Sequence, residues 1–475
     1  MVQNNNKPQK FDFKSLAVLL PLLIGLLMCM LVIKRELWFD EALTVMNFVL
    51  PLSLKEIYVN YTIPNNQIIY SMVLKIWDSL CIIPGDIVIF WRVLSMIFSG
   101  GFVLLIFQLR RKLDEQIYPA ALTLSAVCVS TVFMNYATAL RGYAASWFFI
   151  ALALYGIYLI FKGQKPSNGW LIYCAAALLA VGTVPTNLLA LGAVLIYAIP
   201  WMQKKFWCDK RFYLAAAIIP LALIVFYLPI AKAFLATFKL GEGFSTRFGA
   251  LGMTLSMYVS CFGLLLLFAP WGISKKPWQH YLRYLIWLLP AAAIFILHKA
   301  PFPRVFVTVL PVLIMLVIDG ISKVTAESWK ISHKWALFML VLCVQAMLLP
   351  GMMLLSKKCG VTPEEDDFFR AYYMFKTHRP AETADFLMQK SGHGNPVFLS
   401  FNSDPLPVIF YTAINGVDFR NYRSDIPYNS VKALPDNTLV VLNSQESAAD
   451  FEKRFNGKLE KVQEIKRYTI YRFRK

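Results

Sequence analysis

The chain has 475 residues, of which 58% are hydrophobic and 15% aromatic, and its formal net charge is +19. This composition is too apolar for a soluble protein of that length, and the apolar residues fall in runs of roughly 17 to 23, the length that crosses a bilayer. The sequence therefore predicts a polytopic α-helical membrane protein. The basic residues lie mainly in the connecting loops, where Lys and Arg mark the cytoplasmic side, so the charge does not indicate a nucleic-acid partner.

The first apolar run, from about Leu16 to Ile33, follows a basic start that would also suit a secretory signal. It lacks a small-residue cleavage site and continues into Lys34, Arg35 and Glu36, so we expect a retained membrane anchor. Further spans are predicted at Ile87–Leu109, Tyr118–Tyr136, Ala144–Phe161, Trp170–Thr183, Asn187–Trp201, Phe212–Ala236, Phe248–Trp271, Tyr281–His298, Val305–Ile321 and Trp335–Leu355. The total is about eleven transmembrane helices.

One apolar segment is not counted as a span. Gln67–Ile83 is interrupted by Lys75 and Asp78, which favours a helix lying along the membrane surface. The positive-inside rule then places the N-terminus in the cytoplasm. It also places the first loop, residues 34–86, and everything from residue 356 onward outside the cytoplasm.

Residues 356–475 differ in character from the membrane region, residues 1–355, because charge rises and the apolar runs shorten to strand length. Strands are predicted at Pro396–Phe401, Pro407–Ile414, Thr438–Asn443 and Arg467–Phe473, and helices at Glu382–Lys390 and Ala448–Phe455. This alternation predicts a C-terminal extracytoplasmic α/β domain.

Asp40 and Glu41, in the stretch LWFDEALTV, form the one adjacent acidic pair predicted on the outer side before residue 356. No carboxylate is predicted at mid-membrane depth, which argues against an ion-coupled transporter. Two interpretations of the pair stay open. Asp40 caps an interfacial helix with Glu41 in its first turn, or the pair carries catalytic chemistry.

Three segments in this order resemble the family 39 glycosyltransferases of the GT-C fold. The Asp-Glu pair after the first span is followed by RVLSMIFSGGFVLLIFQLRRKL (Arg92–Leu113), by NYATALRGYAASWFFIALAL (Asn135–Leu154) and by PFPRVFVTVLPVL (Pro301–Leu313). The resemblance covers most of residues 16–355. Two departures are Phe306, in place of the usual aromatic neighbourhood, and IPNNQIIYSMVLKIW (Ile63–Trp77), where members often carry a His-Pro-Pro-like unit.

That family includes protein O-mannosyltransferases and lipid A aminoarabinose transferases. The resemblance implies transfer of a hexosyl or pentosyl group from a polyprenyl-phosphate-linked sugar donor to a lipid, glycan or protein acceptor outside the cytoplasm. It also implies a multi-pass protein of a bacterial inner (cytoplasmic) membrane, with the bilayer itself as a partner.

The chemistry of such a transfer suits the acidic pair. An acceptor hydroxyl is a poor nucleophile, so a carboxylate must take its proton, and Asp40 is the candidate general base. Glu41 would orient the acceptor or strengthen Asp40 as a base. Direct displacement by the activated acceptor predicts inversion at the anomeric carbon. No cofactor is required, although the pair could also hold a divalent metal ion.

The leaving polyprenyl phosphate needs cations, and arginine matches phosphate oxygens with a planar fork. Arg304 and Arg141 are the main candidates for binding the donor phosphate, with Arg92 and Lys299 as secondary contacts. Each could instead snorkel to lipid headgroups. Candidate sugar or acceptor contacts are Asn65, Asn66, Gln67 and Tyr143, and the first three could instead cap a helix.

Two other functions are compatible with the sequence. A non-enzymatic translocator of lipid-linked sugars would also need cationic groups, but it would not need a general base. A membrane-anchored sensor or scaffold would work through its C-terminal domain and would keep its function without much of the membrane region.

Overall fold

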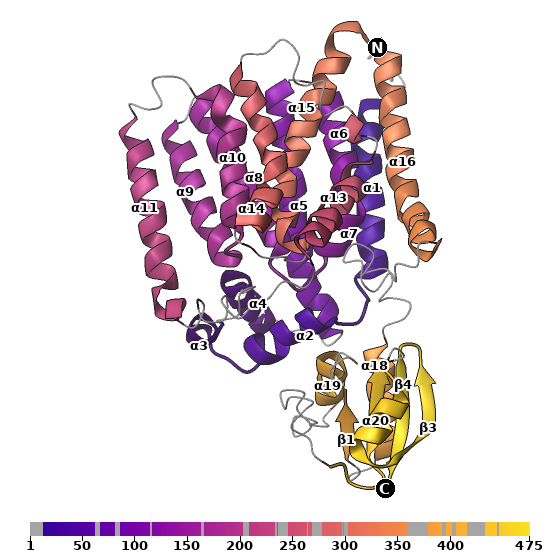
Figure 1. Cartoon of the computed structure of the whole chain (residues 1–475). Helices are drawn as coiled ribbons and strands as arrows, with labels where there is room; N and C mark the ends of the chain where they lie inside the picture. Colours follow the sequence, from indigo (N-terminus) through magenta and orange to yellow (C-terminus); the bar gives the residue numbers. More distant parts are fainter. Residues whose placement is uncertain are drawn as a thin grey trace, which may run out of the picture.

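The structure is a computed structural model. It describes residues 13–475 except 62–66, 81–85, 115, 163–165, 203–208, 233–234, 236–245, 264, 268–277, 297, 299–302, 359–378, 392–395, 401–404, 416–432 and 444–445. The described part consists of a large helical bundle with a small α/β unit against one end (Figure 1). This arrangement confirms the predicted fold class.

The long helices of the bundle run roughly side by side (Figure 1). They are α1 (Phe13–Val32), α5 (Ile87–Asp114), α6 (Ile117–Cys128), α7 (Thr131–Ala137), α8 (Tyr143–Phe161), α9 (Pro166–Thr183), α10 (Asn187–Ala198), α11 (Lys210–Tyr227), α13 (Arg247–Phe262), α14 (Leu285–Ile296), α15 (Leu310–Ser328) and α16 (Ile331–Lys358). Short 3-10 segments extend several of them, namely η2 (Ile199–Trp201), η4 (Leu228–Ile230), η6 (Trp278–Tyr284) and η7 (Pro303–Val309). Every predicted span overlaps one or more of these helices.

Within the described residues, four helical segments are long and apolar enough to cross a membrane by themselves: Ile87–Asp114, Tyr143–Phe161, Lys210–Ile230 and Pro303–Thr325. The pair α6 and α7 makes a fifth if it is counted as one span. Other predicted spans correspond to shorter apolar helices, such as Asn187–Trp201 and His280–Ile296. The total of about eleven spans therefore stays a prediction. The multi-pass helical architecture holds whichever number is correct.

One predicted span is broken. Tyr118–Tyr136 was expected as one helix, but α6 and α7 meet at an angle of 65°. Ser130 explains the break, because its hydroxyl accepts the backbone N–H of Phe133 at 3.1 Å and so starts α7 as an N-cap. The same hydroxyl donates to the carbonyl of Val127 at 3.0 Å. A single serine thus supplies partners to backbone groups that the bend removes from the helical ladder.

The bundle packs closely where small residues face each other. A Cβ added to Gly156 of α8 would lie 2.9 Å from the carbonyl oxygen of Gly169 in α9, and also 2.9 Å from the nitrogen of Tyr173. The two backbones are therefore in contact at this point, as expected for helices that associate in a bilayer through small residues.

A charged cluster joins several helices far from the α/β unit. Asp319 of α15 pairs with Arg110 of α5 at 2.6 Å and with Arg283 of η6 at 2.9 Å, and it accepts the hydroxyl of Tyr197 at 2.9 Å. The guanidinium of Arg283 also lies over the ring of Tyr197, 4.2 Å from its centroid. The cluster satisfies the buried charges with one another and fixes the register of α5, α10 and α15.

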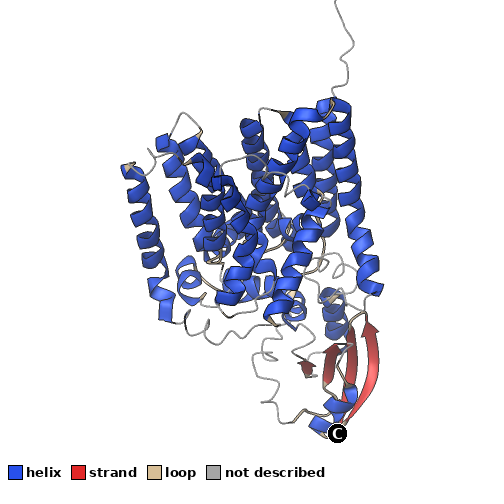
Figure 2. Ribbon diagram, turned by 45° about the horizontal axis from the view of Figure 1, so that its top comes forward, coloured by secondary structure: helices blue, strands red, loops and turns tan. Residues whose placement is uncertain are grey.

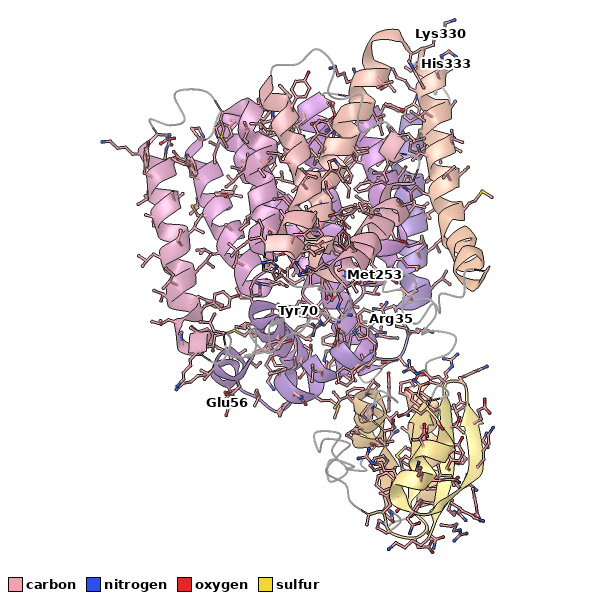
Figure 3. All side chains as sticks on the ribbon, in the orientation of Figure 1. Arg35, Glu56, Tyr70, Met253, Lys330 and His333 are labelled. Carbon is pink, nitrogen blue, oxygen red and sulfur yellow. The ribbon has the colours of Figure 1, made fainter. Side chains whose placement is uncertain are left out.

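The opposite end of the bundle carries α2 (Phe39–Thr44), the π-helical turn η1 (Val45–Val49), α3 (Leu54–Asn60) and α4 (Ile68–Ser79). The last of these corresponds to the predicted surface helix, and all of them lie at the end of the bundle on which the α/β unit is found (Figure 1). Of these elements, α2 contacts α19 of that unit. Lys330 and His333, in contrast, lie at the far end of the molecule (Figure 3). The first loop and the C-terminal unit are thus at the same end, as predicted.

The C-terminal domain, defined here as residues 379–475, contains a β-sheet with helices beside it (Figure 2). The sheet has four strands in the order β1-β2-β4-β3. Its elements are α18 (Pro380–Ser391), β1 (Val397–Leu399), α19 (Pro405–Ile414), β2 (Leu439–Asn443), α20 (Ala448–Phe455), β3 (Lys458–Ile465) and β4 (Tyr468–Arg474). β1 pairs in parallel with β2, and the other neighbours are antiparallel. The proposed boundary at residues 355 and 356 falls inside α16.

One secondary-structure prediction in this domain is wrong, and one strand was not predicted. The predicted strand Pro407–Ile414 lies in α19, which begins with Pro405 and buries Val408 and Phe410. A segment that is apolar on all sides has no period to distinguish a helix from a strand, and proline suits the first turn of a helix. The strand β3 was not predicted, because its side chains are mostly charged and exposed.

Candidate active site

Asp40 and Glu41 both lie in the first turn of α2, where negative charge interacts favourably with the helix dipole. Trp38 precedes the helix, so the expectation that Asp40 is the cap residue is wrong. Glu41 performs that task instead, because its Oε2 accepts the backbone N–H of Trp38 at 3.3 Å. Although adjacent in sequence, the two carboxylates point to different partners.

Glu41 is fully buried and paired with two arginines. Its Oε2 lies 2.8 Å from Nη2 of Arg92, and its Oε1 lies 3.3 Å from Nη2 of Arg35. The backbone N–H of Leu140 also donates to Oε1 at 2.8 Å. Burial by itself raises the pKa of the Glu41 carboxyl, but Arg92 and Arg35 outweigh it, so the pKa lies below its ordinary value. A carboxylate enclosed in this way joins segments of the chain together, and the predicted catalytic role of Glu41 stays a prediction.

Arg92 binds the backbone that connects α1 to α2. It is fully buried in α5 and donates to the carbonyl oxygens of Ile33 at 2.7 Å, of Arg35, and of Glu36 at 3.5 Å, as well as to Glu41. These bonds hold the chain between α1 and α2. Both terminal nitrogens of Arg92 are bonded to backbone or carboxylate oxygens, and its contact with a donor phosphate stays a prediction.

Arg35, labelled in Figure 3, was not singled out from the sequence. It is buried and donates to the hydroxyl of Thr138 and the carbonyl of Asn135, both at 3.3 Å, besides pairing with Glu41. In the sequence, its Lys-Arg-Glu run served only to indicate that the first span is a retained anchor. Only the tertiary structure reveals it as the second cation of a buried cluster.

Asp40 meets Arg304, the first of the predicted phosphate-binding arginines. Nη2 of Arg304, from η7, lies 3.0 Å from Oδ2 of Asp40. The side chain of Asp40 is 22% exposed and that of Arg304 is 10% exposed. This pair is therefore partly accessible, in contrast to the sealed Glu41 cluster beside it.

Arg141, the second predicted phosphate-binding arginine, approaches the same helix from the turn between α7 and α8. Its Nη1 donates to Oγ1 of Thr44 at 2.9 Å and lies 3.4 Å from the carbonyl oxygen of Asp40. Two arginines from distant parts of the chain thus meet at α2, one at the carboxylate of Asp40 and one at its backbone. Thr44 was not predicted, because a threonine at the end of a short helix carries no sequence signal.

Gln67 and Tyr143 lie next to the turn that carries Arg141. Oε1 of Gln67 accepts the backbone N–H of Gly142 at 2.6 Å, and the ring of Tyr143 packs edge-on against Tyr136 with centroids 4.7 Å apart. Both side chains are buried. Both residues contact the turn that carries Arg141 or pack beside it. A sugar contact for either one stays a prediction.

Three further predicted residues, Asn65, Asn66 and Lys299, lie outside the described residues. Over the described part of the chain, no three His, Cys, Asp or Glu side chains gather in a way that could hold a metal ion. Within the acidic pair, the carboxylate of Asp40 pairs with Arg304, and the carboxylate of Glu41 pairs with Arg35 and Arg92.

The comparisons with known proteins bear on the fold. No family model and no curated protein sequence matches the chain. The crystal structure of ArnT from Cupriavidus metallidurans bound to undecaprenyl phosphate is similar over 96% of this chain and 97% of that one, with a TM-score of 0.52 and 13% identity. The apo structure of the same ArnT is similar over 97% and 98%, with a TM-score of 0.52 and 14% identity. The chain therefore has the polytopic GT-C membrane fold of ArnT.

Proposed function

We propose that the protein is a membrane glycosyltransferase that moves a sugar from a polyprenyl-phosphate donor to an extracytoplasmic acceptor. The observation that carries the proposal is the partly exposed pair of Asp40 and Arg304, with Arg141 bound to the same helix. A fold match to ArnT bound to undecaprenyl phosphate supports a lipid phosphate as the donor carrier. The protein belongs in the inner membrane, with its N-terminus in the cytoplasm and its C-terminal domain outside.

The proposed reaction is a single displacement. Asp40 takes the proton of the acceptor hydroxyl as the hydroxyl oxygen forms a bond to the anomeric carbon. The bond between that carbon and the phosphate oxygen breaks, and the polyprenyl phosphate leaves with the electron pair. Attack opposite the leaving group inverts the anomeric configuration.

Arg304 and Arg141 supply the positive charge that the departing phosphate requires. Arg304 is paired with Asp40, so a bound donor phosphate would compete with this carboxylate for the guanidinium. When the phosphate takes over that contact, the Asp40 carboxylate is released to face the acceptor. The buried Glu41 and Arg92 act on the reaction through the position of α2.

The test compares transfer of radiolabelled sugar from a polyprenyl-phosphate donor in membranes that contain the native protein, Asp40→Asn or Glu56→Gln at equal expression. Glu56 is a fully exposed carboxylate at the same end of the molecule, where it caps α3 (Figure 3). Asp40→Asn is expected to lose transfer while donor binding persists, and Glu56→Gln to transfer like the native protein. Undiminished transfer by Asp40→Asn would refute Asp40 as the base, and no transfer by the native protein would favour a translocator.

A further inference from the structure

The short segment that leads into α2, residues 36–38, is held from both sides. From within the bundle, Arg92 bonds to the carbonyl of Glu36 and to its neighbours. From the other side it meets α18 and α19 of the C-terminal domain. Asp40 follows directly after this segment, so whatever fixes it also fixes the candidate base.

The first contact of the C-terminal domain is a hydrogen bond to the backbone. Leu37 is fully buried, and its N–H donates to the hydroxyl oxygen of Tyr411 in α19 at 3.1 Å. Because Leu37 lies ahead of α2, its N–H has no place in the ladder of that helix. A buried N–H without an acceptor destabilises the folded state, and a tyrosine of the C-terminal domain provides the acceptor.

The second contact is made by the side chain of Glu36. Its Oε2 accepts the backbone N–H of Ala381 at 2.7 Å, in the first turn of α18, where helix N–H groups lack internal partners. Nη1 of Arg379 lies 3.6 Å from Oε1 of the same carboxylate. Glu36 thus binds the start of α18 through two groups.

Apolar side chains seal the junction. The ring of Phe410 in α19 lies 6.0 Å from that of Trp91 in α5, and both Leu406 and Phe410 belong to the buried core of the bundle. From the side of the bundle, Met46 of η1 packs against the core of the C-terminal domain. The two parts therefore share one continuous core around α2.

We propose that Tyr411 and Glu36 are positioning residues, through which the C-terminal domain holds α2 so that Asp40 faces the substrates. The expected effect on sugar transfer rests on the proposed function. The contacts of Tyr411 and Glu36 do not depend on it. α2 has six residues, too few to form a stable helix alone. Its position depends on the groups that bind its start, and a misplacement of about 1 Å can lower a rate by roughly 10²-fold.

The experiment uses the full-length protein in membranes or detergent and compares Tyr411→Phe with Tyr471→Phe. Both changes remove one hydroxyl from a partly buried tyrosine of the same domain, but Tyr471 lies in β4 and packs on the other face of the sheet. Two quantities are measured for each, namely hydrogen exchange of the peptide that contains Leu37, and kcat and KM for sugar transfer.

Tyr411→Phe is expected to speed exchange at Leu37 by roughly fivefold, the loss of one hydrogen bond. It should also lower kcat by about tenfold with little change in KM for the donor. Tyr471→Phe should match the native protein in both measurements. Unchanged exchange, or faster exchange with an unchanged kcat, would overturn the proposal.

Hydrogen exchange separates this inference from the proposed function. If the native protein transfers no sugar, the function fails, and the positioning of a catalytic base fails with it. Exchange at Leu37 then still decides whether the C-terminal domain holds the start of α2.

Discussion

At the scale of single residues, two neighbouring carboxylates have separate tasks. Glu41 is sealed between Arg35 and Arg92, whereas Asp40 is partly exposed beside Arg304. The resemblance drew attention to Asp40, Arg304 and Arg141, and the structure brings these three together. The sequence resemblance could not separate the roles of Asp40 and Glu41, because the burial of each side chain depends on which distant helices pack over it.

The first prediction concerns Glu41→Gln. The change removes the negative charge shared by two buried arginines, and breaking a buried ion pair costs about 3–5 kcal/mol. Denaturant unfolding in detergent should show a loss of this size. Asp40→Asn, which alters a partly exposed pair, should lose much less. Equal losses for the two variants would contradict the distinction between them.

The second prediction concerns pH and Glu36. Burial raises the pKa of the Glu36 carboxyl above its ordinary value of 4.5, and the N–H of Ala381 and the charge of Arg379 offset this only in part, with Glu382 opposing them. The folded protein therefore binds this proton more tightly than the unfolded chain does. Its contribution to stability is greatest at low pH and is lost as pH rises from about 4.5 through the raised pKa.

The measurement is the free energy of unfolding of the native protein and of Glu36→Gln across this pH range. Glutamine retains an oxygen for the Ala381 N–H but does not titrate. The difference between the two proteins should shift in favour of Glu36→Gln as pH rises. A difference that is constant, or that shifts the other way, would show that Glu36 is not held in the buried setting described here.

At the scale of elements, the sequence predicted helices well wherever an apolar run was long. It failed at α19 and at the bend between α6 and α7. Helix α19 is apolar on all sides because it packs against both the core of the bundle and the core of the C-terminal domain. The bend between α6 and α7 depends on the hydroxyl of Ser130. In both places the local structure is set by a tertiary contact or by a single side-chain hydrogen bond, which the hydrophobic periodicity of the sequence does not record.

The third prediction tests the contact between α8 and α9. A methyl group at Gly156 would meet the backbone of Gly169 at 2.9 Å, so Gly156→Ala must push the helices apart and should cost about 1–3 kcal/mol. The control is Gly100→Ala in α5, where nothing lies within 4 Å of the added carbon. That change should be neutral or stabilise the helix by about 0.5–1 kcal/mol. Thermal unfolding in detergent measures both, and similar melting temperatures would argue against the close contact.

At the scale of the whole molecule, the first loop, the candidate site and the C-terminal domain gather at one end of the bundle (Figure 1). The positive-inside rule predicted this grouping from loop charges alone. The contact of α19 with the segment before α2 could not be predicted from the sequence, because it joins Leu37 and Tyr411 across 374 positions. No local pattern records a pairing at that separation.

The fourth prediction concerns orientation. Glu56 and Lys330 are exposed at opposite ends of the molecule (Figure 3). In intact cells or right-side-out vesicles, a membrane-impermeant maleimide should label Glu56→Cys, and it should label Lys330→Cys only after the membrane is opened. The unsubstituted protein gives the background from native cysteines. Labelling of Lys330→Cys in the intact membrane would reverse the proposed topology.

The central claim is that Asp40 removes the proton of the acceptor during transfer, and single-turnover kinetics test it most directly. Purified protein loaded with a polyprenyl-phosphate sugar is mixed with acceptor, and donor binding is measured on the same sample. Asp40→Asn is predicted to bind donor within about twofold of the native protein and to transfer sugar about 10²–10⁴ times more slowly, the usual contribution of a general base. Native-like transfer by Asp40→Asn, or no transfer by the native protein, would contradict the account.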